Sequence, residues 1–140
     1  MTEWISVQNP SGSPDELGPL QLAWLGDAVW ETHQRLRHCK KPGRSKDLHF
    51  AVVSEVKAAA QARALLLLEP HLSLLEQEMV RRGRNKAGRG PRNGDAAIYA
   101  KATGFETMVG WLFLKNPHRL AQLLDRLEES DSALQKALNK

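Results

Sequence analysis

Hydrophobic positions recur along this chain at three- and four-residue intervals, and no segment alternates convincingly in the manner of a strand. The spacing predicts helices over residues 17–38, 47–68, 74–83, 94–114 and 117–138. Ser54 could serve as an N-cap and divide the second of these helices into two. The pattern therefore predicts an all-α domain without internal repeats or a second domain.

Local signals set the expected helix ends. Ser73 and Glu76 form a capping-box pattern at the start of the third helix, and Gly83 is well placed to end it. Asn93 can cap the fourth helix. Asn116–Pro117 pairs an N-cap with proline at the first helical position and predicts the start of the last helix.

The length of 140 residues gives room for one domain, and no apolar run approaches the roughly 18 residues that span a bilayer. Residues 1–16 carry acidic groups, unlike a signal or transit peptide, and are expected to form a flexible N-terminal tail. Residues 17–140 are expected to form the domain. The single Cys39 fits a reducing compartment, and the prediction is a cytoplasmic protein without a membrane segment or a structural zinc site.

Charge is unevenly distributed along the chain. Its net value is +4, but residues 81–92 hold six basic residues and no acidic one, leaving 14 Lys/Arg against 16 Asp/Glu elsewhere. Clustered positive charge favours a polyanionic partner. A second and weaker candidate patch comprises Lys40, Lys41, Arg44 and Lys46, for which a solvated loop is the favoured interpretation.

Two carboxylates lie in apolar surroundings. Asp27 follows Leu25–Gly26, and Glu106 lies within Phe105–Leu112. A charge buried in such a helix face costs several kcal/mol unless it is paired or binds a cation. Two carboxylates on separate helices could converge on a divalent metal such as magnesium, although escape to solvent or pairing with Arg or Lys is the commoner outcome for one such residue.

Several segments resemble one known family. Leu22–Val29 resembles the signature helix of the ribonuclease III family, whose pattern ends in Leu-Gly-Asp-Ala/Ser-Val, and Phe105–Leu114 resembles its second catalytic helix. Other segments resemble the Mini-ribonuclease III branch: Val80–Lys86, Pro91–Asn93, Leu48–His49, Val53–Ser54 and Gln61–Ala62. The motifs occur in family order over about residues 17–128.

The resemblance implies a ribonuclease III-like endonuclease domain that cleaves double-stranded RNA with Mg2+ and leaves a 5′-phosphate and a 3′-hydroxyl. It also implies a homodimer without a separate double-stranded-RNA-binding domain, acting on the stem of 23S ribosomal RNA precursor. A ribosomal protein or pre-ribosomal particle is a candidate partner. By position, Asp27 and Glu106 are the implied catalytic residues and metal ligands.

The site is reduced relative to larger members of the family. Leu20, Ala23 and Thr103 stand where those members carry further acidic residues, so the number of metal ions stays open. Glu31 lies one turn after Asp27 and is a possible additional ligand, although a solvated side chain is favoured. His49 occupies a motif position, and a hydrogen-bonded structural residue is the favoured interpretation.

The basic segment is expected to grip RNA phosphates with little reading of bases. The predicted RNA-binding residues are Arg81, Arg82, Arg84, Asn85, Lys86, Arg89 and Arg92. Trp24, Trp30 and Trp111 are assigned to packing. Two other functions compete: a catalytically inactive ribonuclease III-like RNA-binding or ribosome-assembly module, and a helical adaptor for an acidic protein. Retention of both carboxylates argues against each.

Overall fold

The computed structural model describes residues 14–39 and 54–138, and these residues are helical without a strand. Two short 3-10 turns, η1 (Pro14–Glu16) and η2 (Glu69–His71), accompany five longer helices. The helices are α2 (Pro19–His38), α4 (Ser54–Leu68), α5 (Leu74–Lys86), α6 (Ala96–Lys115) and α7 (Pro117–Leu138). The predicted all-α class is confirmed for this part of the chain.

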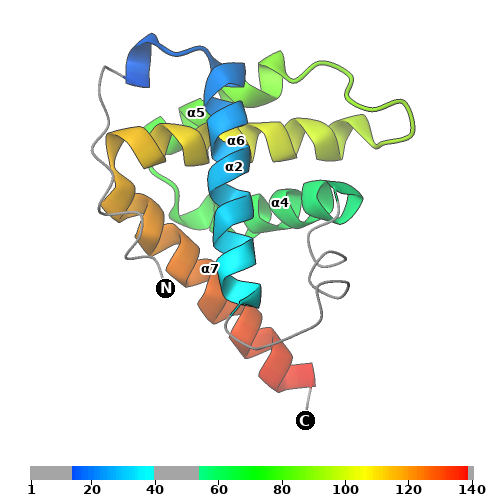
Figure 1. Ribbon diagram of the computed structural model, residues 1–140, viewed down its shortest axis with the longest axis vertical. Helices are drawn as coiled ribbons and strands as arrows, with labels where there is room; N and C mark the ends of the chain where they lie inside the picture. The colour runs from blue at the N-terminus through cyan, green and yellow to red at the C-terminus, as the bar shows by residue number, and fades with distance from the viewer. Residues whose placement is uncertain (1–13, 40–53, 139–140) are drawn as a thin grey trace.

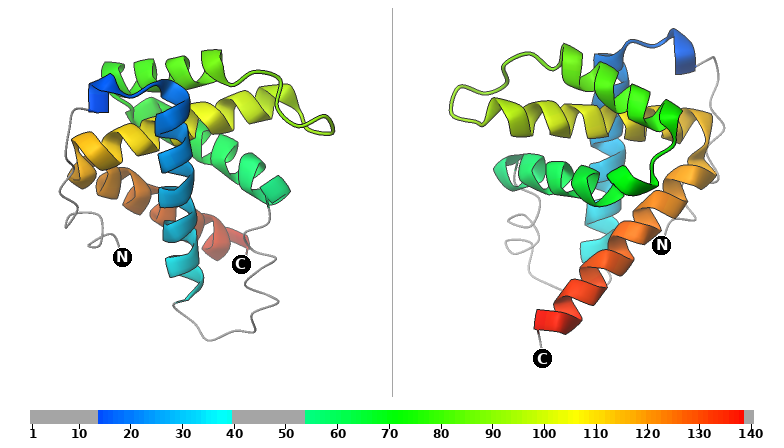
Figure 2. Two further views of the ribbon diagram at one scale, coloured as in Figure 1. Left: turned by 45° about the horizontal axis from the view of Figure 1, so that its top comes forward. Right: turned by 180° about the vertical axis from the view of Figure 1, so that it is seen from behind.

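Helix α6 is the centre of the fold. It packs against α2, α4, α5 and α7. Figure 1 shows α2 crossing in front of α6 at a steep angle, and Figure 2 shows α7 running diagonally past the other helices. From Ala102 to Leu112 every residue of α6 except Glu106 is buried. A helix that is apolar on all sides belongs in the interior, so this sequence dictates the central position.

The core gathers around that central helix. Trp30 of α2 meets Phe105 of α6 edge to face, with ring centroids 5.1 Å apart and planes at 89°. Helix α7 closes the core with Leu120, Leu123, Leu124 and Leu127. None of the described helices is long and apolar enough to cross a membrane.

Two glycines allow α2 and α6 to touch through their backbones. A Cβ atom on Gly26 would collide with the carbonyl oxygen of Glu106, and one on Gly110 would collide with the carbonyl oxygen of Leu22. Thr107 adds a hydrogen bond across the crossing, donating from its hydroxyl to the Pro19 carbonyl at 3.1 Å. These contacts therefore fix the position of α2 around Gly26 relative to α6 between Glu106 and Gly110.

The expected helix ends are partly right. The Ser73–Glu76 capping box forms, and the Asn116 side chain accepts a hydrogen bond from the Arg119 amide. The prediction that Gly83 ends a helix is wrong: α5 continues to Lys86, and Gly83 is buried where α5 packs closely against Thr107 and Gly104 of α6.

A second helix end also differs from the prediction. Helix α6 begins at Ala96 rather than Gly94, because Asp95 rather than Asn93 is the cap. The Asp95 carboxylate accepts from the Ala97 and Ile98 amides at 2.8 and 3.3 Å.

The assignment of three tryptophans to packing holds for two of them. Trp30 and Trp111 are buried in the core, whereas Trp24 is 78% exposed, so for Trp24 the assignment to packing stays a prediction. Other predictions lie outside the described residues: most of the N-terminal tail, residues 47–53 of the second helix, His49 and the patch from Lys40 to Lys46. The division into residues 1–16 and 17–140 stays a prediction.

Candidate active site

Asp27 and Glu106 meet where α2 crosses α6. Asp27 directly follows Gly26, and Gly26 packs against the backbone of Glu106. The two carboxyl groups are close enough to share a hydrogen bond, which contributes to the pKa of Glu106. The close approach of glycine therefore brings together the two carboxylates that the sequence singled out.

The surroundings of Glu106 favour its protonated form. Burial, followed by the hydrogen bond and negative charge of Asp27, raises the pKa of Glu106 from its usual 4.5 to about 8. The Gln61 amide and the Lys57 ammonium act in the opposite direction but do not outweigh these effects. Two carboxylates that hold one proton between them form a site that a cation would complete.

Helix α4 supplies the third side of this site. The Lys57 ammonium contacts Oδ1 of Asp27 as an ion pair. Gln61, one turn further along α4, is 2% exposed and approaches Glu106. The Lys57 ammonium is the partner of Asp27 Oδ1, and the Gln61 amide acts on the neighbouring Glu106 carboxyl. Helix α4 therefore presents a positive charge to Asp27 and an amide to Glu106.

Sequence reasoning missed Lys57. Gln61 belongs to a segment that resembles the family, and Lys57 lies four residues earlier, on the same face of a helix. That spacing is the signal that could have found it.

The possible third carboxylate does not join the pair. Glu31 forms an ion pair with Arg35, one turn along the same helix, at 3.1 Å. Among the described residues no group of three or more acidic, histidine or cysteine side chains gathers at a possible metal site. Within the described part of the chain, the acidic groups that meet at the site are therefore Asp27 and Glu106.

The predicted RNA-binding residues lie on α5 and the loop after it. Arg81 and Arg82 both pair with Glu78, with Nε–carboxylate distances of 2.9 and 3.2 Å. The hydrogen bond from Arg81, followed by the hydrogen bond from Arg82 and both positive charges, outweighs the opposing effect of burial and lowers the pKa of Glu78 to about 2. These two arginines are therefore partly neutralised.

The remaining basic side chains of this segment are exposed: Arg84, Lys86, Arg89 and Arg92. Gly88 and Gly90 have φ angles of 70° and 79°, a left-handed conformation that residues with side chains rarely adopt. The glycines thus shape the turn from which the later basic residues project, and Figure 1 shows this loop extending away from the helices.

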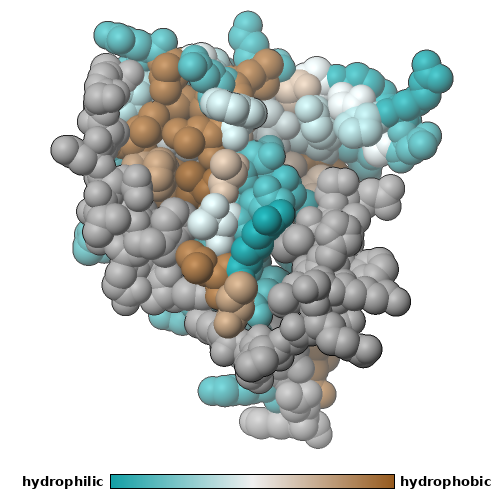
Figure 3. Space-filling model, viewed as in Figure 1, coloured by the Kyte–Doolittle hydropathy of each residue, from teal (hydrophilic) through white to brown (hydrophobic). Residues whose placement is uncertain are grey.

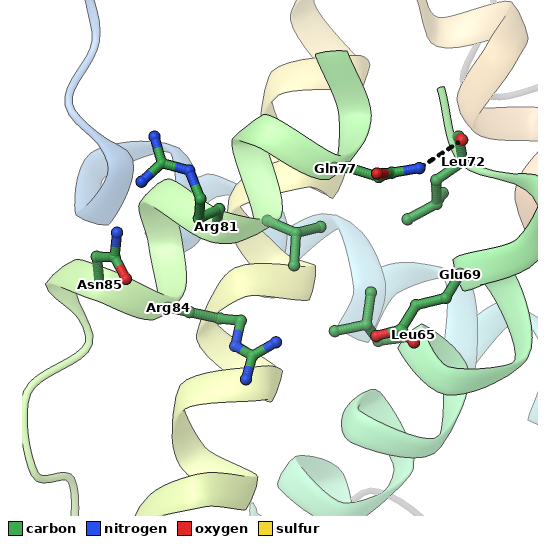
Figure 4. A pocket seen from close by; sticks show the side chains of 8 residues that line it. Leu65, Glu69, Leu72, Gln77, Arg81, Arg84 and Asn85 are labelled. Carbon is green, nitrogen blue, oxygen red and sulfur yellow. Dashed lines mark hydrogen bonds between the residues drawn. The ribbon is translucent and has the colours of Figure 1, made fainter. Parts of the chain in front are cut away.

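A groove of about 440 Å³ lies between α4, η2 and α5. Figure 4 shows Arg81, Arg84 and Asn85 along one side, with Glu69 and Leu65 on the other. Gln77 is held at its end by donating to the Leu72 carbonyl at 3.1 Å. The carboxylate of Glu69 makes this groove a mixed surface rather than a purely positive one.

An ion pair between the buried Glu76 and the partly exposed Arg119 fastens α5 to α7. Arg119 donates to both oxygens of Glu76 at 2.9 and 3.1 Å and to the His71 carbonyl at 2.8 Å. Burial raises the pKa of Glu76, but hydrogen bonds from Arg119 and the Ser73 backbone outweigh it and lower the pKa overall. The base of the basic helix is therefore rigidly placed relative to the core.

Comparison with known proteins assigns the class of this domain. The Ribonuclease III domain model matches residues 20–117, a span that contains both carboxylates and the basic segment. A crystal structure of a protein from Fusobacterium nucleatum shares the fold, with a TM-score of 0.73 and 23% identity over 83% of this chain and 95% of that one.

Several relatives confirm the assignment to the ribonuclease III family, and they are all named Mini-ribonuclease 3. The chain is 42% identical over 132 residues to Mini-ribonuclease 3 of Synechocystis sp., covering 93% of this chain and 92% of that protein. It is 48% identical to Mini-ribonuclease 3 of Synechococcus sp. over 80% and 81% of the two chains. It is 45% identical to Mini-ribonuclease 3 of Symbiobacterium thermophilum over 80% and 88%. The chain belongs to the ribonuclease III family and is an endoribonuclease of that type.

Proposed function

We propose that this endoribonuclease cleaves double-stranded RNA in the cytoplasm, with Asp27 and Glu106 as the carboxylates that hold Mg2+, and that its substrate is a stem of 23S ribosomal RNA precursor. The observation that carries the proposal is the meeting of these two side chains, from the two family motifs, at the α2–α6 crossing. The names of the similar proteins and the resemblance support the choice of substrate.

The residues fit a divalent cation. Asp27 and Glu106 bring two carboxyl groups together, and carboxylate oxygens are the ligands that Mg2+ prefers. When bound, the cation would activate water and offset the negative charge that develops on the phosphate.

The residues of the chain would place the substrate for hydrolysis. The reaction adds the oxygen of one water to phosphorus and breaks the bond to the 3′ oxygen, which takes up a proton; a 5′-phosphate and a 3′-hydroxyl remain. Asp27 is 38% exposed on its side chain, so a phosphodiester can approach the pair from solvent. Once ionised, Asp27 of α2 and Glu106 of α6 would orient the attacking water and the scissile phosphate.

The basic segment would supply the grip on RNA. Arg84, Lys86, Arg89 and Arg92 project from the end of α5 and the following loop, so they are suited to phosphate contacts. Arg81, Arg82 and Asn85 join them, although the first two share Glu78. Such contacts recognise the shape and charge of a duplex rather than its sequence.

A second copy of the chain is the proposed partner. Figure 3 shows hydrophobic surface gathered beside the upper part of α2. Trp24 and Leu20 lie one turn apart on that helix, and both are exposed. Large apolar side chains exposed together on one face are typical of an interface. Two copies related by a twofold axis would present two sites, one for each strand of a duplex.

An incubation of the purified protein with a precursor ribosomal RNA stem and Mg2+ tests the function, with Asp27→Asn alongside. Wild type should cut both strands and leave 5′-phosphates. Asp27→Asn should bind the same duplex and cut it at least about a thousandfold more slowly, since it loses a metal ligand. Absence of cutting by wild type would point to an inactive RNA-binding module; cutting by Asp27→Asn at the normal rate would disprove the role of Asp27.

Binding measurements with the same duplex separate RNA binding from catalysis. Arg84→Gln with Lys86→Gln should weaken binding and reduce its dependence on salt, because fewer counterions are released. Arg126→Gln with Lys136→Gln removes the same charge from exposed positions of α7 and should leave binding close to that of wild type. Equal losses in both double variants would contradict a localised RNA surface.

A further inference from the structure

Lys57 lies against the carboxylate pair, in direct contact with Asp27. It belongs to α4, its ammonium contacts Asp27 Oδ1, and its positive charge also acts on Glu106. Its side chain is 21% exposed, so the ion pair lies at the mouth of the site rather than in a sealed interior. The lysine is thus in a position that both a metal ion and a substrate phosphate would approach.

A divalent cation and this ammonium would compete for the same oxygen. Two positive ions held against Asp27 Oδ1 would repel each other strongly at the low effective dielectric of a protein site. Lysine has a flexible four-carbon stem and three donors, so it can leave one acceptor and reach another nearby. Asp27 has its backbone fixed by the Gly26 contact and cannot move away as easily.

The charge balance of the site suggests a role for the displaced Lys57 ammonium. Two carboxylates balance a single divalent cation, and no third acidic group joins them within the described residues. The negative charge that grows on a phosphodiester during hydrolysis then needs another positive group. Lys57 is the cation that α4 places against this pair.

We propose that Lys57 is an exchangeable countercharge and a further catalytic residue: it neutralises Asp27 in the free protein and moves to the scissile phosphate when the site is loaded. This inference rests on the proposed function. Gln61 is buried beside Glu106 and keeps its position on α4 when the Lys57 side chain moves.

Metal binding without RNA tests the exchange. Mn2+, which accepts the same oxygen ligands as Mg2+, is titrated into the protein while free Mn2+ is counted by electron paramagnetic resonance. Lys57→Met should bind Mn2+ about tenfold more tightly than wild type, because a competing positive charge is gone. Lys136→Met removes an exposed lysine from α7 and should bind as wild type does.

Unchanged or weaker Mn2+ binding by Lys57→Met would overturn the exchange. Circular dichroism and thermal unfolding check that the variant is folded. If it is not, Lys57→Gln has the same expectation with a polar side chain, and Lys57→Arg, which keeps the charge, should stay near the wild-type affinity.

Cleavage at saturating Mg2+ tests the second role. Lys57→Met should lower kcat at least tenfold while KM for the duplex changes little, and Lys57→Arg should recover part of the loss. A merely structural lysine would instead give normal kcat once metal saturates, and that result would overturn the proposal. If wild type cuts no duplex, the proposed function fails, whereas the Mn2+ titration still decides whether Lys57 competes with metal.

Discussion

At the scale of single residues, Glu106 links the chemistry of the site to the stability of the protein. Its pKa is about 8 in the folded chain and near 4.5 when unfolded. Between these values the folded protein keeps a proton that the unfolded chain has released, so stability falls as pH rises. Below pH 4.5 both states hold the proton, and Glu106 does not reduce stability. Above pH 8 both states have released it, and the loss of stability is complete.

Glu106→Gln should remove this pH dependence. In urea unfolding with EDTA present, the free energy of unfolding of wild type should fall by on the order of a few kcal/mol between pH 5 and pH 9 because of Glu106. The variant should not show this fall. Glu129→Gln removes an exposed carboxyl group from α7 and should follow wild type. A variant whose stability falls as steeply as that of wild type would show that Glu106 is not the responsible group.

The sequence could predict Asp27 and Glu106 because each lies in a local motif with apolar neighbours. It could not predict that Lys57 contacts Asp27, since that pairing depends on how α4 is placed against α2. Nor could it show that Arg81 and Arg82 share Glu78, although the spacing of three and four residues made the pairing available. Side-chain partners across elements require the packed structure.

At the scale of helices, periodicity predicted the five longer described helices but not the 3-10 turns η1 and η2, and the other errors occurred at helix ends. Gly83 continues its helix because close packing against α6 outweighs the general tendency of glycine to end one. Asp95 replaces Asn93 as a cap because both are good caps and local sequence does not choose between them. The contact between Gly26 and Glu106 was equally hidden, since it joins distant segments.

Gly110→Ala should destabilise the protein although alanine is the better helix former. Propensity alone would stabilise α6 by about 1 kcal/mol. The new methyl group would meet the Leu22 carbonyl, and separating two packed helices costs about 1–3 kcal/mol or more. Thermal and urea unfolding should therefore show a net loss of stability.

Gly18→Ala is the matched control for this substitution. A Cβ atom there meets nothing within 4 Å, and the φ of −72° suits any residue. Because Gly18 is the N-cap of α2 and alanine is a poorer cap, its cost should be about 0.5–1 kcal/mol and smaller than that of Gly110→Ala. If Gly110→Ala proves as stable as this control, the backbone contact between α2 and α6 is not tight.

At the scale of the whole molecule, the surface separates into regions of different character. The basic loop after α5 projects at one end of α6, and hydrophobic surface lies on the other side of α2 (Figures 1 and 3). The carboxylate pair lies at the crossing of these two helices. A duplex and a second copy of the chain can therefore approach different faces without competing.

Leu20→Glu should convert a dimer into a monomer. Light scattering after gel filtration should give wild type twice the chain mass of 15.7 kDa, and the variant the single mass, because a charge cannot be buried in an apolar interface without a partner. Leu74→Glu is the control: Leu74 is 83% exposed on α5, and that variant should stay dimeric. A wild-type monomer, or a Leu20→Glu dimer, would place the contact between copies elsewhere or remove it. Loss of cutting together with loss of the dimer would further indicate that the two sites act on one duplex.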